Sequence, residues 1–190
     1  MDDIQQLFEN FYAKSVNMIT PPNDSDLHLL TLFSIAIEIR ATNILELGVR
    51  SGDTTEPLLC AAAIVDGMLT SVDFYQTPWK CPPSLEKHFK FVQSDSIDFL
   101  LNKCDKHYDL ILIDDWHAYS HVKKELELID KITDVGSIIL MHDLTTGDDP
   151  SYYMPDRPHH VKTEWEGGGP YKAVSELDTN KWEWSTIPAN

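Results

Sequence analysis

The stretch ILELGVRSGDTT, residues 44–55, decides the fold. It reads as a short apolar strand, a turn with Gly48 and Gly52, and the start of a helix. Glycine lets the backbone of such a turn approach a ligand closely, and the helix N-terminus offers unpaired N–H groups. A second apolar run, TSVDFY at 70–75, contains Asp73, where such folds accept hydrogen bonds from ribose hydroxyls. The pattern predicts an α/β fold that binds a nucleoside-bearing ligand.

The details of the turn discriminate between nucleoside ligands. A dinucleotide fingerprint reads G-x-G-x-x-G, and its middle glycine lets the pyrophosphate approach. In this chain Arg50 occupies that position and Glu46 precedes the first glycine, so the pattern is E-x-G-x-x-x-G. The Glu46 carboxylate would repel a pyrophosphate but would suit a cationic ligand. The alternative is an ordinary strand and helix cap in which Glu46 is solvated.

Composition indicates one compact domain. A chain of 190 residues, 42% of them hydrophobic, can build one well-buried core and is too short for two comfortable domains. The 15 basic and 31 acidic residues give a formal net charge of −16. Nucleic acid is therefore not expected as a partner, because phosphate binding depends on Lys and Arg.

The cysteines and the N-terminus bear on localisation. Cys60, Cys81 and Cys104 form no CxxC pair, which predicts neither a disulfide framework nor a zinc site and fits a reducing cytoplasm. The N-terminus lacks the features of a signal peptide, and no apolar run is long enough to span a bilayer. We therefore expect a cytoplasmic protein with no membrane role.

Apolar periodicity predicts alternating helices and strands. Two helical patterns, before and after Pro21 and Pro22, are expected to cover the sheet or the cofactor mouth. Strands are expected at 43–47, 69–74, 89–93, 109–114 and 137–142, and helices near 53–65, 95–102, 118–132 and 170–178. This alternation is typical of a Rossmann-like, doubly wound α/β fold, a single domain with a mostly parallel sheet and helices on both faces.

Within this domain we expect N-terminal helices at 1–40, a cofactor-binding core at 41–146 and a substrate or lid loop at 147–170. The loop is too long for an idle connection. WEWSTIP, 182–188, is a candidate sixth strand. One more antiparallel strand is expected where the sequence ends at Asn190. We therefore expect either a chain that is truncated before its final strand, or a sheet edge that is open or is completed by a partner chain, as in a homodimer.

Two sets of acidic and histidine side chains follow the predicted fourth and fifth strands: Asp114, Asp115 and His117, and then His142 and Asp143. In a parallel sheet these residues reach the same carboxyl edge as the glycine turn, where ligands bind. Carboxylates and imidazoles bind magnesium, manganese or iron, and without a cation the like charges would repel one another. The alternative is that the acids cap the following helices, which is the better reading for Asp115.

Two longer strings carry a resemblance to a known family. IDDWHAYSHVKKELEL (113–128), followed by GSIILMHD (136–143), resembles the IDG-H-Y-V-D-L … GG-I-HD signature of small class I S-adenosylmethionine-dependent methyltransferases. The E-x-G-x-x-x-G turn is similar to motif I of that class. The relatives include macrolide-sugar O-methyltransferases, cephalosporin hydroxylase-like proteins and, more distantly, catechol O-methyltransferase. The resemblance covers about residues 40–146.

The resemblance implies a catalytic site with a divalent cation such as Mg²⁺, held by Asp114, His142 and Asp143. His117 would be the general base, so Asp114 and His117 are the expected catalytic residues. His117 would remove the proton of a substrate hydroxyl, and the oxygen would then attack the sulfonium methyl in line. Relatives with a demonstrated metal more often have a carboxylate or an amide where His142 stands.

The resemblance also implies a set of contacts to S-adenosylmethionine: Glu46, Gly48, Gly52, Asp73, Asp95 and Ser96. The first three would line the methionine half of the cofactor, and Asp73 would bind the ribose hydroxyls. The last two follow the third strand and would lie near adenine, although a helix cap explains them equally well.

The leading hypothesis is a methyltransferase that uses S-adenosylmethionine and a divalent cation to O-methylate a small hydroxylated metabolite such as a sugar. One alternative is a metal-dependent hydroxylase-like enzyme on the same fold, because the cephalosporin hydroxylase-like relatives share the Asp and His motifs. Another is a non-catalytic nucleoside-binding protein. The methyl acceptor is not predicted, because the loop and the N-terminal helices hold no recognisable motif.

Overall fold

Five apolar runs form the strands of one parallel sheet, because buried aliphatic side chains that alternate between two covered faces favour extended structure. The strands are β1 Asn43–Leu47, β2 Met68–Asp73, β3 Phe89–Gln93, β4 Leu110–Ile113 and β5 Ile138–Met141. They pair in the order β3-β2-β1-β4-β5, and every neighbouring pair is parallel. The structure, a computed structural model, describes residues 3–16, 24–144 and 168–187.

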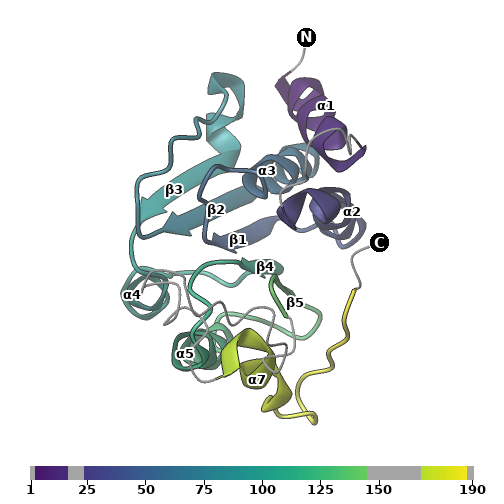
Figure 1. Cartoon of the computed structure of the whole chain (residues 1–190). Helices are drawn as coiled ribbons and strands as arrows, with labels where there is room; N and C mark the ends of the chain where they lie inside the picture. Colours follow the sequence, from purple (N-terminus) through teal and green to yellow (C-terminus); the bar gives the residue numbers. More distant parts are fainter. Residues whose placement is uncertain (1–2, 17–23, 145–167, 188–190) are drawn as a thin grey trace, which may run out of the picture.

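Helices cover both faces of the sheet (Figure 1). On one face lie α1 Asp3–Val16, α2 Leu29–Glu38 and α3 Thr55–Ile64, with the short 3₁₀ helices η1 Asp24–Leu27 and η2 Pro83–His88 nearby. On the other face lie α4 Ser96–Asn102, α5 Tyr119–Ile129 and α7 Gly169–Ser175. The predicted doubly wound α/β fold with a parallel sheet is confirmed.

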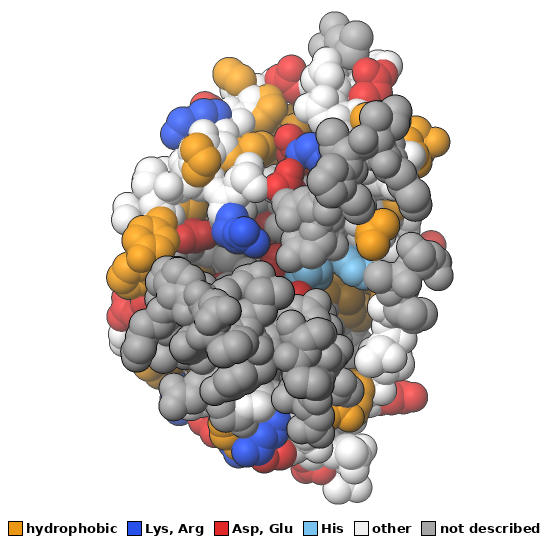
Figure 2. Space-filling model, viewed as in Figure 1, with side chains coloured by type: hydrophobic (Ala, Val, Ile, Leu, Met, Phe, Trp, Pro, Cys, Tyr) orange, Lys and Arg blue, Asp and Glu red, His pale blue; other side chains and the backbone are white. Residues whose placement is uncertain are grey.

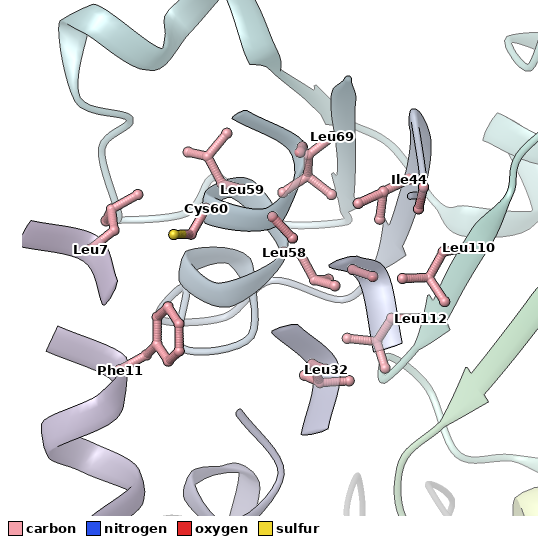
Figure 3. Packing of buried hydrophobic residues seen from close by; sticks show 14 of the residues in the cluster. Leu7, Phe11, Leu32, Ile44, Leu58, Leu59, Cys60, Leu69, Leu110 and Leu112 are labelled. Atoms are coloured by element: carbon pink, nitrogen blue, oxygen red, sulfur yellow. The ribbon is translucent and has the colours of Figure 1, made fainter. Parts of the chain in front are cut away.

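The two faces carry separate hydrophobic cores, and the alternation of β4 divides its side chains between them. Leu110 and Leu112 pack toward α1, α2 and α3, where Phe11 of α1 is fully buried (Figure 3). Ile111 and Ile113 pack toward α4, α5 and α7. Burial on both faces fixes the register of the strands. It therefore also fixes which residues stand at the carboxyl edge of the sheet.

The predicted elements match the observed ones closely, except at the C-terminus. Each of the five strands is found within one residue of its expected bounds, and the helices are found within three. The sixth strand expected at 182–188 is wrong, because the described residues 182–187 form no strand and pair with no neighbour. Trp184 is 40% exposed and contacts Tyr171 of α7, so the alternating tryptophans do not bury a face on the sheet.

Two further expectations concern the periphery of the domain. The expected substrate or lid loop at 147–170 lies outside the described residues, apart from the first turn of α7. Among the helices that the structure describes, none is both long and apolar enough to cross a membrane.

Candidate active site

The glycine turn after β1 packs directly against the end of β4. Gly48 has a φ of +92°, and its N–H donates to the carbonyl oxygen of Val72 at 2.9 Å. A Cβ at this position would lie 2.2 Å from the carbonyl oxygen of Asp114. Only glycine tolerates both the positive φ and this approach. The turn and the end of β4 are therefore neighbours, as the parallel order β1-β4 requires.

Asp73, at the end of β2, holds the same turn in place. Its Oδ2 accepts hydrogen bonds from the backbone N–H groups of Val49, at 2.8 Å, and Arg50, at 3.0 Å. Its Oδ1 accepts one from the N–H of Tyr75 at 2.8 Å. The acid that the sequence predicts as a ribose contact thus also shapes the turn. Each carboxylate oxygen offers about two lone pairs, so acceptor capacity remains.

Glu46 lies in the interior, where its carboxylate has no exposed surface. Its oxygens accept hydrogen bonds from Thr54 Oγ1 at 2.7 Å, Thr55 Oγ1 at 2.9 Å and the hydroxyl of Ser71. Burial raises the pKa of Glu46 to about 7, although these hydrogen bonds lower it. The alternative of a solvated Glu46 is wrong. The structure places this residue behind the turn, where it fixes the start of α3.

A pocket opens in front of the turn and joins it to the acidic cluster. Its lining consists of Ser25, Gly48, Val49, Arg50, Ser51, Asp53, Thr54 and Asp114. Gly52 stands at the same turn with a φ of +85° but faces the side chain of Trp79, where a Cβ would lie 2.4 Å from the ring. The pocket therefore includes Gly48 from the predicted cofactor set and Asp114 from the predicted catalytic set.

The residues after β4 and β5 form a cluster of two carboxylates and two imidazoles. His117 Nε2 lies 3.1 Å from Asp143 Oδ2 and 4.0 Å from Asp114 Oδ1. His142 Nδ1 lies 3.4 Å from Asp114 Oδ1 and 3.3 Å from Asp143 Oδ2. All four side chains are less than 20% exposed. The structure thus brings together all four residues that the sequence predicts for catalysis and metal binding.

The electrostatics of this cluster follow from its burial and its opposite charges. Burial lowers the pKa of His142, but Asp114 and Asp143 outweigh it and raise that pKa to about 10. The pKa of Asp143 is held below its ordinary value by His117 and His142, against the effect of burial. Burial raises the pKa of Asp114 despite the nearby His142. Asp143 also has a φ of +57°, a strained conformation for a residue with a side chain, and such strain is concentrated at functional sites.

The geometry of a cation site differs in one residue from the predicted set. Within the described parts of the chain, the ligand atoms of Asp114, His117 and Asp143 lie within 4.8 Å of one another. The sequence predicts His142 as the third ligand and reserves His117 for proton transfer. Both imidazoles reach the two carboxylates, so the donor set fits a divalent cation with either one.

The predicted adenine contacts have structural partners of their own. Asp95 is exposed and caps α4, where its Oδ1 accepts a hydrogen bond from the N–H of Asp98 at 3.0 Å. Ser96 is buried, and its Oγ lies 2.9 Å from His121 Nε2. The helix-cap alternative is thus confirmed for Asp95. The cap leaves its exposed side chain at the carboxyl edge of the sheet.

Sequence reasoning missed two residues from the N-terminal region. Ser25 of η1 lines the pocket, and the ring of His28 packs edge-on against His142 with the ring centroids 5.4 Å apart. Neither residue stands in a recognisable motif. Their proximity to the site depends on how α2 packs over the sheet, which a sequence pattern does not indicate. Figure 2 shows histidine side chains near the middle of this face, with acidic and basic side chains around them.

Comparisons with known proteins agree with this fold. A family model described as "Methyltransferase domain" matches residues 45–144. A search of curated proteins gave no match. Among solved structures, the SAH-bound methyltransferase PaMTH1 of Podospora anserina is 15% identical with a TM-score of 0.56, covering 93% of this chain and 76% of its own. A putative caffeoyl-CoA O-methyltransferase of Staphylococcus aureus is 16% identical with a TM-score of 0.57, covering 92% and 81%.

A third solved structure includes a metal ion. It is the methyltransferase MycE of the mycinamycin biosynthetic pathway in complex with Mg, SAH and mycinamycin VI. It is 15% identical with a TM-score of 0.53, and the match covers 85% of this chain and 44% of that one. At such identities the likeness demonstrates a common fold.

Proposed function

The chain belongs to the methyltransferase-domain family, and on this basis we propose that it transfers the methyl group of S-adenosylmethionine to a hydroxyl of a small metabolite such as a sugar. The family match confirms the prediction of a methyltransferase. It favours methyl transfer over the hydroxylase-like alternative. The cluster of carboxylates and imidazoles beside the pocket favours an enzyme over a non-catalytic binding protein.

One observation carries the proposal: Asp114 lines the same pocket as the glycine turn. A cofactor bound along Gly48 would present its reactive end to the cluster of Asp114, His117, His142 and Asp143. Methyl transfer needs the acceptor oxygen and the sulfonium methyl in line at short range. SAH in the Podospora anserina methyltransferase, and Mg with SAH in MycE, support the same pairing of cofactor and cation for this chain.

For the cofactor we propose the predicted contacts with one change of role. Gly48, Gly52 and Asp73 would shape the turn against the methionine and ribose parts, and Asp95 with Ser96 would stand near adenine. Glu46 would act as a positioning residue, because its carboxylate has no exposed surface. It would hold the hydroxyls at the start of α3, and thereby the pocket wall that Thr54 supplies.

For proton transfer we propose His117 as the general base. A substrate proton taken up by its ring gives an imidazolium, and Asp143 Oδ2, 3.1 Å from His117 Nε2, stabilises that charge and orients the ring. His142, whose pKa is raised to about 10, is protonated at neutral pH and balances the two carboxylates until a cation replaces its proton.

We propose that Asp114, His142 and Asp143 would hold the divalent cation, which leaves His117 for the proton. When bound, a divalent cation lowers the pKa of a hydroxyl that it contacts. The competing arrangement uses His117 as the third ligand. The two arrangements differ in which imidazole controls cation affinity.

Three peripheral features remain proposals. We expect the loop at 147–170 and the N-terminal helices (1–40) to select the acceptor that meets the cofactor-binding core (41–146). A homodimer could complete the sheet at β5, and a monomeric mass by light scattering would contradict this. The three cysteines are free, which fits work in the cytoplasm.

Calorimetric titration tests the proposed function. S-adenosylmethionine, its demethylated product and NAD are each titrated into the purified protein with and without Mg²⁺. We expect micromolar binding of the first two and none of NAD, and an effect of Mg²⁺ on the binding of S-adenosylmethionine or its product. Preference for NAD, or binding of neither methyl-transfer ligand, would overturn the proposal.

A further inference from the structure

A second group of ligand-bearing side chains lies next to the candidate active site, on the side of α4 and α5. It comprises Asp115, which follows Asp114 in the loop after β4, together with His121 and Glu125 of α5. In the part of the chain that the structure describes, the ligand atoms of these three residues lie within 4.8 Å of one another. None of the three has a role in the proposed methyl transfer.

All contacts in this group converge on one nitrogen atom. His121 Nε2 lies 3.4 Å from Asp115 Oδ2, 3.4 Å from Glu125 Oε1 and 2.9 Å from Ser96 Oγ. An imidazole nitrogen carries at most one hydrogen, so it cannot donate to three acceptors at once. Ligand atoms about 2.0–2.1 Å from a tetrahedral cation lie about 3.4 Å apart, which is the spacing between His121 Nε2 and each of the two carboxylates.

The buried carboxylate of Glu125 is an independent indication that a cation binds between these residues. Its side chain has no exposed surface, and neither of its carboxylate oxygens accepts a hydrogen bond from the described residues. Asp115 Oδ1 is buried without a hydrogen bond as well. A buried carboxylate without a hydrogen-bond donor is costly, since burial removes its hydration. A divalent cation would displace the proton of Glu125 and neutralise both carboxylates.

We propose that Asp115, His121 and Glu125 form a second cation site, for a divalent transition metal of the zinc or manganese class. One imidazole and two carboxylates are ligands that such borderline ions bind, and zinc is the ion used in the test below. Ser96 Oγ, 2.9 Å from His121 Nε2, is a candidate fourth ligand. The side chains of Asp115 and His121 are 18% and 17% exposed, so an ion has a route from solvent.

The site has a consequence for the neighbouring active site. A cation held by these residues cross-links the loop after β4 to helix α5. That loop carries Asp114 and His117, so the ion would position the catalytic side chains without touching the substrate. The proposal is independent of the methyl-transfer function, because it predicts metal binding by the protein without cofactor.

Zinc titration of the 190-residue chain at neutral pH, with a chromophoric chelator as competitor, tests the site. The background is Asp143→Asn, which disables the first cluster. In this background we expect one zinc ion to bind, and both Glu125→Gln and His121→Asn to weaken that binding by about 100-fold or more. Glu127→Gln, an exposed acid on the same helix paired with Lys124, is the matched control and should leave zinc affinity unchanged.

The substitutions also separate a metal site from a purely structural ion pair. Burial raises the pKa of Glu125 to about 8, so glutamine is close in shape and charge to the protonated acid and should fold. Circular dichroism checks the fold, and zinc should raise the melting temperature of the Asp143→Asn protein but not of the Asp143→Asn/Glu125→Gln protein. Equal zinc affinity in these two proteins would overturn the proposal, as would the absence of zinc binding in Asp143→Asn.

Discussion

The carboxyl edge of the sheet carries acids in two regions that differ in what surrounds them. At the carboxyl ends of β1 and β2, Glu46 accepts hydrogen bonds from three hydroxyls and Asp73 accepts them from three backbone N–H groups. After β4 and β5, Asp114 and Asp143 lie against two imidazoles instead. The protein itself completes the first region with fixed donors. The second is balanced by groups whose charge depends on protons.

This difference assigns separate tasks to the two regions. Donors that cannot dissociate give a rigid turn, which suits recognition of a cofactor. An imidazole can take up a proton from a substrate or give up its own proton to bind a cation, so the second region suits chemistry and cation binding. A change in the first region should therefore alter stability and cofactor affinity, while one in the second should alter turnover and cation affinity.

The largest expected effect is on turnover in the second region. His117→Asn should lower the rate of methyl transfer by about 100- to 10,000-fold, because it removes the general base. Affinity for S-adenosylmethionine should stay within about twofold, since the turn is untouched. Release of the demethylated cofactor, with a panel of sugars and polyols as acceptors, measures the rate.

The matched pair for cation binding is His142→Ala and His117→Ala, because an amide at position 142 could itself bind the cation. His142→Ala should lower Mg²⁺ affinity in a calorimetric titration more than His117→Ala does. The reverse order would make His117 the third ligand and would remove its assignment as the base. Both variants remove an imidazole from the same cluster, so a general loss of packing would affect them alike.

The next effect is the pH dependence of stability that Glu46 contributes. Its pKa is raised from 4.5 to about 7, so the folded state holds a proton that the unfolded state releases. The contribution is fully present below pH 4.5 and is lost as the pH rises through about 7, and it amounts to about 3 kcal/mol. Denaturant unfolding of the wild type and Glu46→Gln across this range should give a difference that falls with rising pH.

Asp143 provides the opposite case for the same measurement. Its pKa is lowered in the folded state, so its contribution is present above the unfolded pKa and is lost as the pH falls. The difference between the wild type and Asp143→Asn should therefore rise with pH. Two differences of the same sign would contradict the contrast between the regions.

Some site residues could be predicted from the sequence because they follow a recognisable pattern, and others could not. The strands and the acids behind them were predictable, because apolar runs and parallel order bring their carboxyl ends to one edge. The burial of Glu46 was not, since the pattern E-x-G-x-x-x-G does not indicate the three hydroxyls around it. The same holds for Ser25 and His28, which reach the site only through the packing of η1 and α2 on the sheet.

The proposed second cation site could be predicted from the sequence only in part. His121 and Glu125 stand four residues apart in a predicted helix, so their common face could be read from the sequence. Their meeting with Asp115 and Ser96 depends on how α4 and α5 pack together. The expectation of a sixth strand is wrong for the opposite reason. The alternation in WEWSTIP is a local sequence pattern, and in the described residues this segment pairs with no strand of the sheet.

Gly48 lies at the point where the two regions touch. Gly48→Ala places a methyl group against the Asp114 carbonyl at a positive φ, whereas Gly136→Ala, at a φ of +102°, meets nothing within 4 Å. The conformational cost of about 1–2 kcal/mol is common to both. Gly48→Ala should destabilise the fold by about 2 kcal/mol more, from the added steric clash. Equal losses in denaturant unfolding would mean that the regions are not tightly packed.

The smallest expected effect is on cofactor affinity at Asp95, where two substitutions distinguish a helix cap from a cofactor contact. Asp95→Ala removes the acceptor for the N–H of Asp98 and should cost about 1 kcal/mol of unfolding free energy, whereas Asp95→Asn keeps an equally good cap and should cost almost nothing. Because the asparagine variant keeps α4 intact, any loss of S-adenosylmethionine affinity in it reports a direct contact. We expect a loss of a few-fold, since the side chain is exposed and solvent weakens its hydrogen bonds. Unchanged affinity in Asp95→Asn would leave Asp95 as a cap alone and would limit the cofactor contacts after β3 to Ser96.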